Sequence, residues 1–173
     1  MTKLVKLTLI GMMLAPMSLN AQQGAKSFVE QYKKQDGFTV VTIGKPAMRM
    51  IYLFAKAGMI MENADAQILK FVDAVQVISF DSGRDKDRRE TFNSEALAFC
   101  NASCYEELIE VVVERNETVK IFCKTEDEAI TELIVLCSGS ERSSVEMVCI
   151  NGKFAFDDIQ TVTGSFEKKL ASK

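Results

Sequence analysis

The sequence contains no histidine and no tryptophan, and it has only 9 glycines and 2 prolines. Without histidine, this chain alone cannot build a Ser-His or Cys-His nucleophile or a histidine-ligated metal site. Glycine-rich phosphate loops and the Gly-x-Ser-x-Gly nucleophile elbow are also missing. The scarcity of glycine and proline excludes collagen-like architectures. We therefore expect a protein that is not an enzyme, with no catalytic residues, no cofactor and no metal.

The residues that are present have the composition of an ordinary globular protein. Hydrophobic side chains make up 47% of the chain and charged side chains 26%, which excludes wholesale disorder. A length of 173 residues suits about one domain. Because no repeat, linker or low-complexity segment divides the chain, we expect a single domain.

The N-terminus has the organisation of a secretory signal peptide. Two lysines precede an uncharged, largely apolar run over residues 7–19, and Ala21 supplies a small residue after it. This order is typical of a signal peptide, and the run is shorter than the roughly 20 residues that span a bilayer. The alternative is a buried N-terminal helix. We expect a signal peptide over residues 1–21, cleaved within a few residues of Ala21, and a domain over residues 22–173.

The charge of the chain also bears on its partners and its location. Removing the two N-terminal lysines leaves 19 basic and 24 acidic residues and lowers the net charge from −3 to −5. A mildly acidic chain without a basic stripe or clustered aromatic residues gives no electrostatic basis for nucleic-acid binding. The best later apolar stretch, residues 47–61, contains Arg49 and Lys56, so we expect no transmembrane segment in the mature chain. These features predict a periplasmic or secreted protein, with an association with the outer membrane left open.

Hydrophobic periodicity predicts two strand–helix units in the first part of the chain. Two β-branched runs have the character of strands, and each leads into a segment with helical spacing of its apolar residues. The expected elements, in order, are a lead-in helix within residues 22–37, a strand at 38–43, a helix from Pro46, a short helix at about 64–72, a strand at 75–80 and a helix from Asp85 to about Ser103.

After Tyr105 the apolar period changes from 3.6 to 2, which indicates strands. The expected elements are strands at about 109–114, 118–124, 129–137 and 145–150, a turn at Asn151-Gly152 and a last helix from about 156 to 170. The third of these strands is the most apolar, which predicts a central position. The sequence as a whole predicts an α+β domain. It has a mixed sheet of about six strands with two strand–helix units, a C-terminal antiparallel meander and a terminal helix.

Several stretches resemble one known family. They are Phe-Val-Glu-Gln-Tyr-Lys-Lys-Gln-Asp-Gly-Phe-Thr-Val-Val-Thr-Ile-Gly-Lys at residues 28–45, Asp-Ser-Gly at 81–83, Tyr-Glu-Glu-Leu at 105–108 and Ile-Thr-Glu-Leu-Ile-Val-Leu at 130–136. Together with the signal peptide, they resemble the exported Bacteroidetes proteins grouped as DUF4252, over roughly residues 24–170. The resemblance implies an envelope or stress-regulation setting and carries over no catalytic residue. Five cysteines are more than this resemblance leads us to expect.

The cysteines are Cys100, Cys104, Cys123, Cys137 and Cys149. Exported proteins can keep disulfides, so one or two bridges with a spare thiol are one interpretation. The expected hairpins place Cys123 opposite about Ile130 and Cys149 opposite about Glu132, so no strand pair presents two cysteines to each other. Because all five lie within apolar patterns, we expect buried free thiols that pack as small hydrophobic residues. A metal site would rest only on the weak Cys100-x-x-x-Cys104 pair.

Other candidate motifs have simpler explanations. Ser165 and Lys168 match Ser-x-x-Lys, but the partner motifs of that chemistry are absent. Asp81, Asp85 and Asp87 supply three carboxylates without the spacing of a calcium loop. A turn followed by a charged helix start accounts for them better, although hydrolysis through Asp81 and Asp85 is a third hypothesis. It requires a concave site with paired acids of shifted pKa.

Two hypotheses on function remain. The first is a non-enzymatic exported module that binds another protein of the cell envelope through a sheet edge or a helix face. The second is a carrier of a small apolar ligand, held between helices and sheet near a methionine cluster. This cluster comprises Met48, Met50, Met59 and Met61, and core packing is its alternative explanation. The partner, the ligand and the oligomeric state do not follow from the sequence.

Overall fold

The computed structural model describes residues 24–57, 69–81, 85–113, 117–139 and 144–155. The helices are α1 (Ala25–Tyr32), α2 (Lys45–Lys56) and α4 (Lys86–Ala102). The strands are β1 (Phe38–Ile43), β2 (Val72–Asp81), β3 (Glu106–Val113), β4 (Glu117–Glu126), β5 (Ala129–Gly139) and β6 (Ser144–Phe154). The lead-in helix, both strand–helix units and the four-stranded meander are therefore confirmed.

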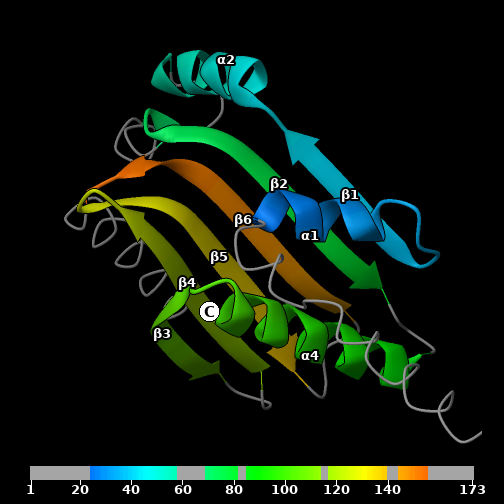
Figure 1. The fold of residues 1–173 in the computed structure, drawn as a ribbon. Coiled ribbons are helices and arrows are strands. Elements are labelled where there is room, and N and C mark those ends of the chain that lie inside the picture. Colours follow the sequence, from blue (N-terminus) through cyan, green and yellow to red (C-terminus); the bar gives the residue numbers. More distant parts are fainter. Residues whose placement is uncertain (1–23, 58–68, 82–84, 114–116, 140–143, 156–173) are drawn as a thin grey trace, which may run out of the picture.

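The six strands form one open sheet in the order β1-β2-β6-β5-β4-β3 (Figure 1). All five pairings are antiparallel. The α+β architecture is confirmed, but the expectation of a mixed sheet is wrong for the strands described. The physical reason is the path of β6, which returns from the meander and enters between β5 and β2. It runs antiparallel to both of these strands.

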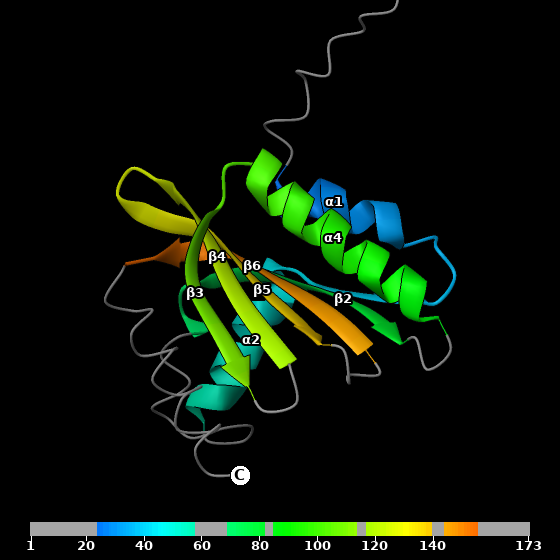
Figure 2. The ribbon, with the colours of Figure 1, turned by 90° about the horizontal axis from the view of Figure 1, so that it is seen from below.

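The two faces of the sheet carry separate apolar clusters. Adjacent residues of a strand point to opposite faces, and in β5 the neighbours Leu133 and Ile134 belong to different clusters, both buried. Helices α1 and α4 lie side by side over the face of Ile134 (Figure 2), whereas α2 lies on the face of Leu133. The burial of both faces confirms the central position predicted for this strand.

Aromatic rings fill the space between α1, α4 and the start of β1. The rings of Phe28 and Phe99 stack with centroids 4.5 Å apart, and Phe92 meets Phe38 edge-on at 5.2 Å. Tyr32 packs against Phe92 at 5.0 Å. Because such ring pairs have preferred geometries, they position the two helices relative to β1.

Helix α4 ends in a tight cap. The backbone N–H of Tyr105 donates to the carbonyl of Cys100 at 3.1 Å, and Cys104 adopts a φ of 59°. This is the Schellman arrangement, in which the left-handed position is usually a glycine. A cysteine there turns the chain sharply from α4 into β3.

Two expectations on local structure are wrong, and two others concern residues that the structure does not describe. Val72 begins β2 rather than ending a helix at 64–72, most of which lies outside the described residues. The terminal helix, with Ser165 and Lys168, lies outside them too, as does the segment 1–21. Asn151-Gly152 is not a turn but part of β6, where Gly152 pairs with Val72. Glycine is needed there because a Cβ would meet the Phe71 carbonyl and approach the Phe154 ring to 2.7 Å.

Candidate functional site

The structure does not gather the five cysteines into one site. All five are free thiols, and no two of them face each other across a strand pair. Cys100, Cys123 and Cys149 are buried, and Cys137 is half-buried. Cys104 is exposed, so the expectation that every thiol is buried is wrong at this position. It lies beyond the end of α4, where the cap turns its backbone away from the core.

Burial keeps the three buried thiols protonated. Burial raises the pKa of Cys100 to about 12 and also raises the pKa of Cys123. The pKa of Cys149 is raised by burial in the same way. Since the thiolate is the nucleophile and the metal ligand, these side chains are packing residues. Among the described residues, no group of three or more cysteine and carboxylate side chains lies close enough to hold a metal ion.

The acidic residues at the start of α4 serve the helix. The Asp85 carboxylate accepts a hydrogen bond from the backbone N–H of Arg88 at 2.9 Å, which makes it the N-cap. Asp87 lies in the first turn, where a negative charge is favourable. The side chain of Asp81 lies outside what the structure describes. The simpler interpretation, a turn followed by a charged helix start, is therefore supported by the Asp85 cap.

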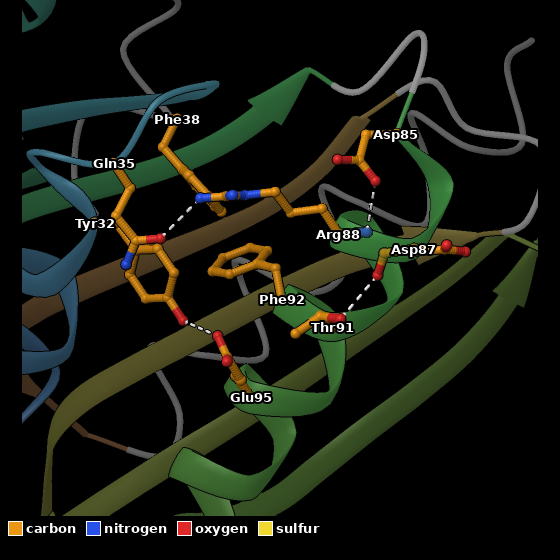
Figure 3. A pocket seen from close by; sticks show the side chains of 9 residues that line it. All are labelled: Tyr32, Gln35, Phe38, Asp85, Asp87, Arg88, Thr91, Phe92 and Glu95. Atoms are coloured by element: carbon orange, nitrogen blue, oxygen red, sulfur yellow. Dashed lines mark hydrogen bonds between the residues drawn. The ribbon is translucent and has the colours of Figure 1, made fainter.

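A hollow of about 460 Å³ lies between α1, the start of β1 and the first half of α4 (Figure 3). Its lining residues are Tyr32, Gln35, Phe38, Asp85, Asp87, Arg88, Thr91, Phe92 and Glu95. The aromatic rings form its floor, and the charged side chains of α4 form its rim. The hollow is on the face of the sheet that α1 and α4 cover, opposite the face of α2.

The polar groups in this hollow are paired with one another. The Tyr32 hydroxyl donates to the Glu95 carboxylate at 2.5 Å, and burial, with Glu95 adding to it, raises the pKa of the tyrosine. The guanidinium of Arg88 donates to the Gln35 amide oxygen at 3.1 Å and lies 5.5 Å from the centre of the Phe38 ring. A tyrosine that holds its proton so firmly is a poor general base. The arrangement links α1 to α4 through the Tyr32–Glu95 and Gln35–Arg88 hydrogen bonds.

The methionine cluster is divided by the structure. Met48 is buried against the sheet, whereas Met50 is 57% exposed. Met59 and Met61 lie outside the described residues. The hollow described above is not near these methionines and has a charged rim, so it does not match the expected site for a small apolar ligand.

The outward face of α2 carries exposed apolar side chains that no described element covers. Leu53 is 62% exposed and Phe54 is 41% exposed, and both lie beside Met50 at helical spacing. We call Met50, Leu53 and Phe54 the outward stripe of α2. Single exposed apolar residues are common, but these three are adjacent on one helix and form one apolar patch.

Basic side chains lie beside the outward stripe. Helix α2 contains Lys45, Arg49 and Lys56 and no acidic residue. These three positions fall together on one side of the helix, so the chain does carry a short basic stripe, contrary to the expectation from its overall charge. Lys45 pairs with Asp73 at 2.7 Å, both being half exposed. The exposed surface of α2 is therefore apolar with a cationic margin.

The sequence contains a second set of apolar residues in α2 that predicts this surface. It is easily missed because the buried set alone accounts for an amphipathic helix. Met48, Ile51 and Ala55 explain an amphipathic helix, but Met50, Leu53 and Phe54 form a second apolar set at spacings of three and four. One apolar side of such a helix packs against the sheet, and the second apolar side remains exposed. The hollow had no such signal, because the Gln35–Arg88 contact joins residues 53 positions apart.

Comparison with known proteins identifies the family. No helix in the described part of the chain is both long and apolar enough to cross a membrane. No curated protein and no solved structure shows significant similarity to the chain. The sequence model of one family, Domain of unknown function (DUF4252), matches residues 32–162. Since this match spans most of the chain and includes every strand of the sheet, the protein belongs to the DUF4252 family.

Proposed function

We propose that this protein is an exported, non-enzymatic module that binds another protein of the cell envelope, in a setting of envelope or stress regulation. The observation that carries the proposal is the outward stripe of α2 with its basic margin. Such a surface is costly to leave in water, and its cost is explained if a partner covers it.

The chemistry of the surface defines the partner. Met50 supplies an adaptable side chain and Phe54 a ring, both of which are enriched where proteins bind one another. Arg49 and Lys56 would repel a cationic partner and attract an anionic one. We infer a protein segment that is apolar at its centre and acidic at its edges, such as an amphipathic helix that packs along α2.

Export rests on the N-terminal pattern. Two lysines, the apolar run 7–19 and Ala21 stand in the order that is typical of a secretory signal peptide. The mass of the protein isolated from its source should equal that of a chain without residues 1–21, within a few residues. An intact N-terminus would remove the export part of the proposal and leave the binding part standing.

The binding part is tested by site-specific crosslinking. A photoreactive amino acid replaces Leu53 in the full chain, expressed in the source organism, and adducts are identified by mass spectrometry. The matched position is Val112, which is 68% exposed on β3. We expect an adduct with one envelope protein at position 53 and none of that protein at position 112.

Charge reversal distinguishes a specific partner from adhesion to an apolar patch. Arg49→Glu together with Lys56→Glu should lower the yield of the adduct about tenfold, because both charges face the acidic edges of the partner. Lys26→Glu on α1, which is also exposed, should leave the yield unchanged. Equal yields in all three proteins, or the same adduct at positions 53 and 112, would refute the proposal.

A further inference from the structure

The two edges of the sheet differ in how well they are protected. Strands β1 and β3 lie at opposite ends of the sheet, so each has one side whose backbone N–H and C=O groups face away from the sheet. An unprotected edge is a template on which another strand can pair. Natural proteins block such edges with charges, prolines or bulges.

Strand β3 has these protections. It contains Glu106, Glu107 and Glu110, and its pairing with β4 is interrupted between Glu107 and Ile109. Lys120 of β4 forms ion pairs with Glu107 and Glu110, at 3.2 Å each, so charges lie along this edge. A second strand would have to meet three carboxylates and a distorted ladder.

Strand β1 has none of them. Its sequence, Phe-Thr-Val-Val-Thr-Ile, contains no charge, glycine or proline, and its six residues pair with β2 without a shift in register. Val41 is 46% exposed. Among the described strands, β2 is the one neighbour of β1, and Figure 1 shows β1 as the outermost arrow beside it. An uncharged, β-branched edge with a regular register is suited to strand addition.

We propose that β1 pairs antiparallel with β1 of a second copy of this chain, which joins the two sheets into one. In such a pair the two-fold axis is perpendicular to the sheet, and one residue lies opposite itself across the axis. An axis at Val40 gives the strand pairs Phe38–Thr42, Thr39–Val41 and Val40–Val40. An axis at Val41 gives Thr39–Ile43, Val40–Thr42 and Val41–Val41. Cross-strand pairs of β-branched and aromatic residues are the favourable ones.

The charges beside β1 support a second copy as the occupant. Asp36 precedes the strand and Lys45 follows it. In an antiparallel pair centred on Val40 or Val41, the Asp36 end of one strand lies at the Lys45 end of the other. Charges of opposite sign therefore meet at both ends of the shared ladder, and the exposed Lys45–Asp73 pair can rearrange at little cost.

The difference between the edges also explains why association stops at two copies. If both edges accepted strands, copies would add head to tail without closing, and fibres would form. Because the β3 edge is charged and bulged, a pair joined through β1 leaves only protected edges at its two ends. The inference is independent of the proposed function, because β1 and the outward stripe of α2 are different surfaces.

Analytical ultracentrifugation tests the association. The full chain is expressed and purified, and its mass shows whether residues 1–21 have been removed. The sedimentation of that protein is then measured. We expect a dimer, and Val41→Lys should raise the dissociation constant about a hundredfold, because it places two lysines at the shared edge. Val112→Lys on β3, matched in type and exposed, should leave the dimer intact. Leu53→Glu should also leave it intact, which separates this interface from the surface of α2.

Crosslinking through cysteine locates the interface even if Val41→Lys perturbs the fold. In a Cys104→Ser background, which removes the exposed thiol, Val40→Cys or Val41→Cys should form a disulfide with the same residue of a second copy on mild oxidation. Val111→Cys on β3 should remain monomeric on a non-reducing gel. A chain that stays monomeric at every concentration, or a dimer that survives Val41→Lys and crosslinks through position 111, would overturn the proposal. The edge would then be covered by another segment of the chain or by a different protein.

Discussion

The hydroxyl of Tyr105 joins α1 to the sheet through the carboxylate of Glu132. It donates a hydrogen bond to Glu132 on β5 and accepts one from the backbone N–H of Ala25 at 3.2 Å. Ala25 is the first residue of α1, so this contact satisfies one of the unpaired N–H groups at the start of that helix. The carboxylate also lies beside Gly24, where a Cβ would approach its oxygen to 2.9 Å, and a negative charge is favourable at a helix N-terminus.

Replacing this tyrosine by phenylalanine should destabilise the fold. Tyr105→Phe leaves the Glu132 carboxylate and the Ala25 N–H without their partner in a buried place, which costs about 1–3 kcal/mol. Urea unfolding followed by circular dichroism measures the loss. Tyr52→Phe is the control, because Tyr52 is only half-buried on α2. Equal stability of the two variants would show that the contact contributes nothing.

Stability should fall in alkaline solution. Burial raises the pKa of Tyr105 and of Tyr32, and raises that of Cys100 to about 12. In the unfolded chain these groups titrate near 10 for tyrosine and 8.5 for cysteine. The folded state therefore holds protons that the unfolded state has lost, and the free energy of unfolding decreases as the pH rises above about 8.5.

The urea midpoint at pH 7, 8, 9, 10 and 11 measures this decrease. Below pH 8 the contribution of the three groups should be constant, because both states keep their protons. Tyr105→Phe should lower stability at pH 7 and flatten the slope above pH 10, since one titrating group is lost, worth up to about 1.4 kcal/mol per pH unit. A slope that is unchanged in this variant would assign the alkaline transition to other groups.

The elements were predictable because their signals are local, whereas the register was not. Cys123 was expected opposite about Ile130 but pairs with Leu133. The expected four-residue turn is in fact two residues, Asp127 and Glu128, with φ of 49° and 62°. The register also shifts beside the turn, because Thr131 of β5 is left between the pairs Lys124–Glu132 and Thr125–Ile130. Two positive φ values in a row require a turn that usually contains asparagine or glycine. Nothing in the sequence Asp-Glu indicates it.

The hollow and the outward stripe of α2 differ in the same way: the stripe depends on local spacing and the hollow on long-range packing. The stripe lies on one helix, so its spacing of three and four could be read from the sequence once the inward set had been assigned. The hollow depends on how α1 and α4 approach each other, which is decided by aromatic packing such as that of Phe28 with Phe99. Long-range packing leaves no periodic trace in a single sequence.

The hairpin between β4 and β5 offers a stabilising substitution. Glu128→Gly should raise the free energy of unfolding by about 0.5–1 kcal/mol, because glycine adopts the observed φ of 62° without strain. Glu126→Gly is the matched control, since Glu126 is a strand residue that pairs with Ala129, and glycine weakens a strand. If both variants lose stability, the turn geometry is different from the one described.

The exposed position of Cys104 predicts how the thiols react. A thiol reagent added to the native protein should modify one cysteine quickly, Cys137 more slowly, and the three buried cysteines only on unfolding. Cys104→Ser should remove the fast phase and leave the others unchanged. Cys123→Ser is the comparison, because it should leave the fast phase intact. Persistence of the fast phase in Cys104→Ser would place another thiol at the surface.

Gly152 should tolerate no side chain, although it lies in a strand. The backbone N–H of Lys153 donates to the Phe71 carbonyl at 3.1 Å, and this contact brings the chain before β2 against β6. A methyl group at position 152 would meet that carbonyl and the Phe154 ring, whose nearest atom would be 2.7 Å away. Phe154 is buried in the cluster beneath α2, so it cannot move without disturbing neighbouring side chains.

The expected loss for Gly152→Ala is about 1–3 kcal/mol, the cost of overpacking a well-filled core. Thermal and urea unfolding should agree on this value, and Gly44→Ala serves as the control. At position 44 the nearest atom to a new Cβ is the Pro46 Cδ at 3.9 Å, an ordinary contact. Gly44 is the N-cap of α2, where alanine is less favourable than glycine, so the loss for Gly44→Ala should be about 0.5–1 kcal/mol. If Gly152→Ala is as stable as Gly44→Ala, then Gly152 does not lie against Phe71 in solution, and the expected turn at Asn151-Gly152 regains support.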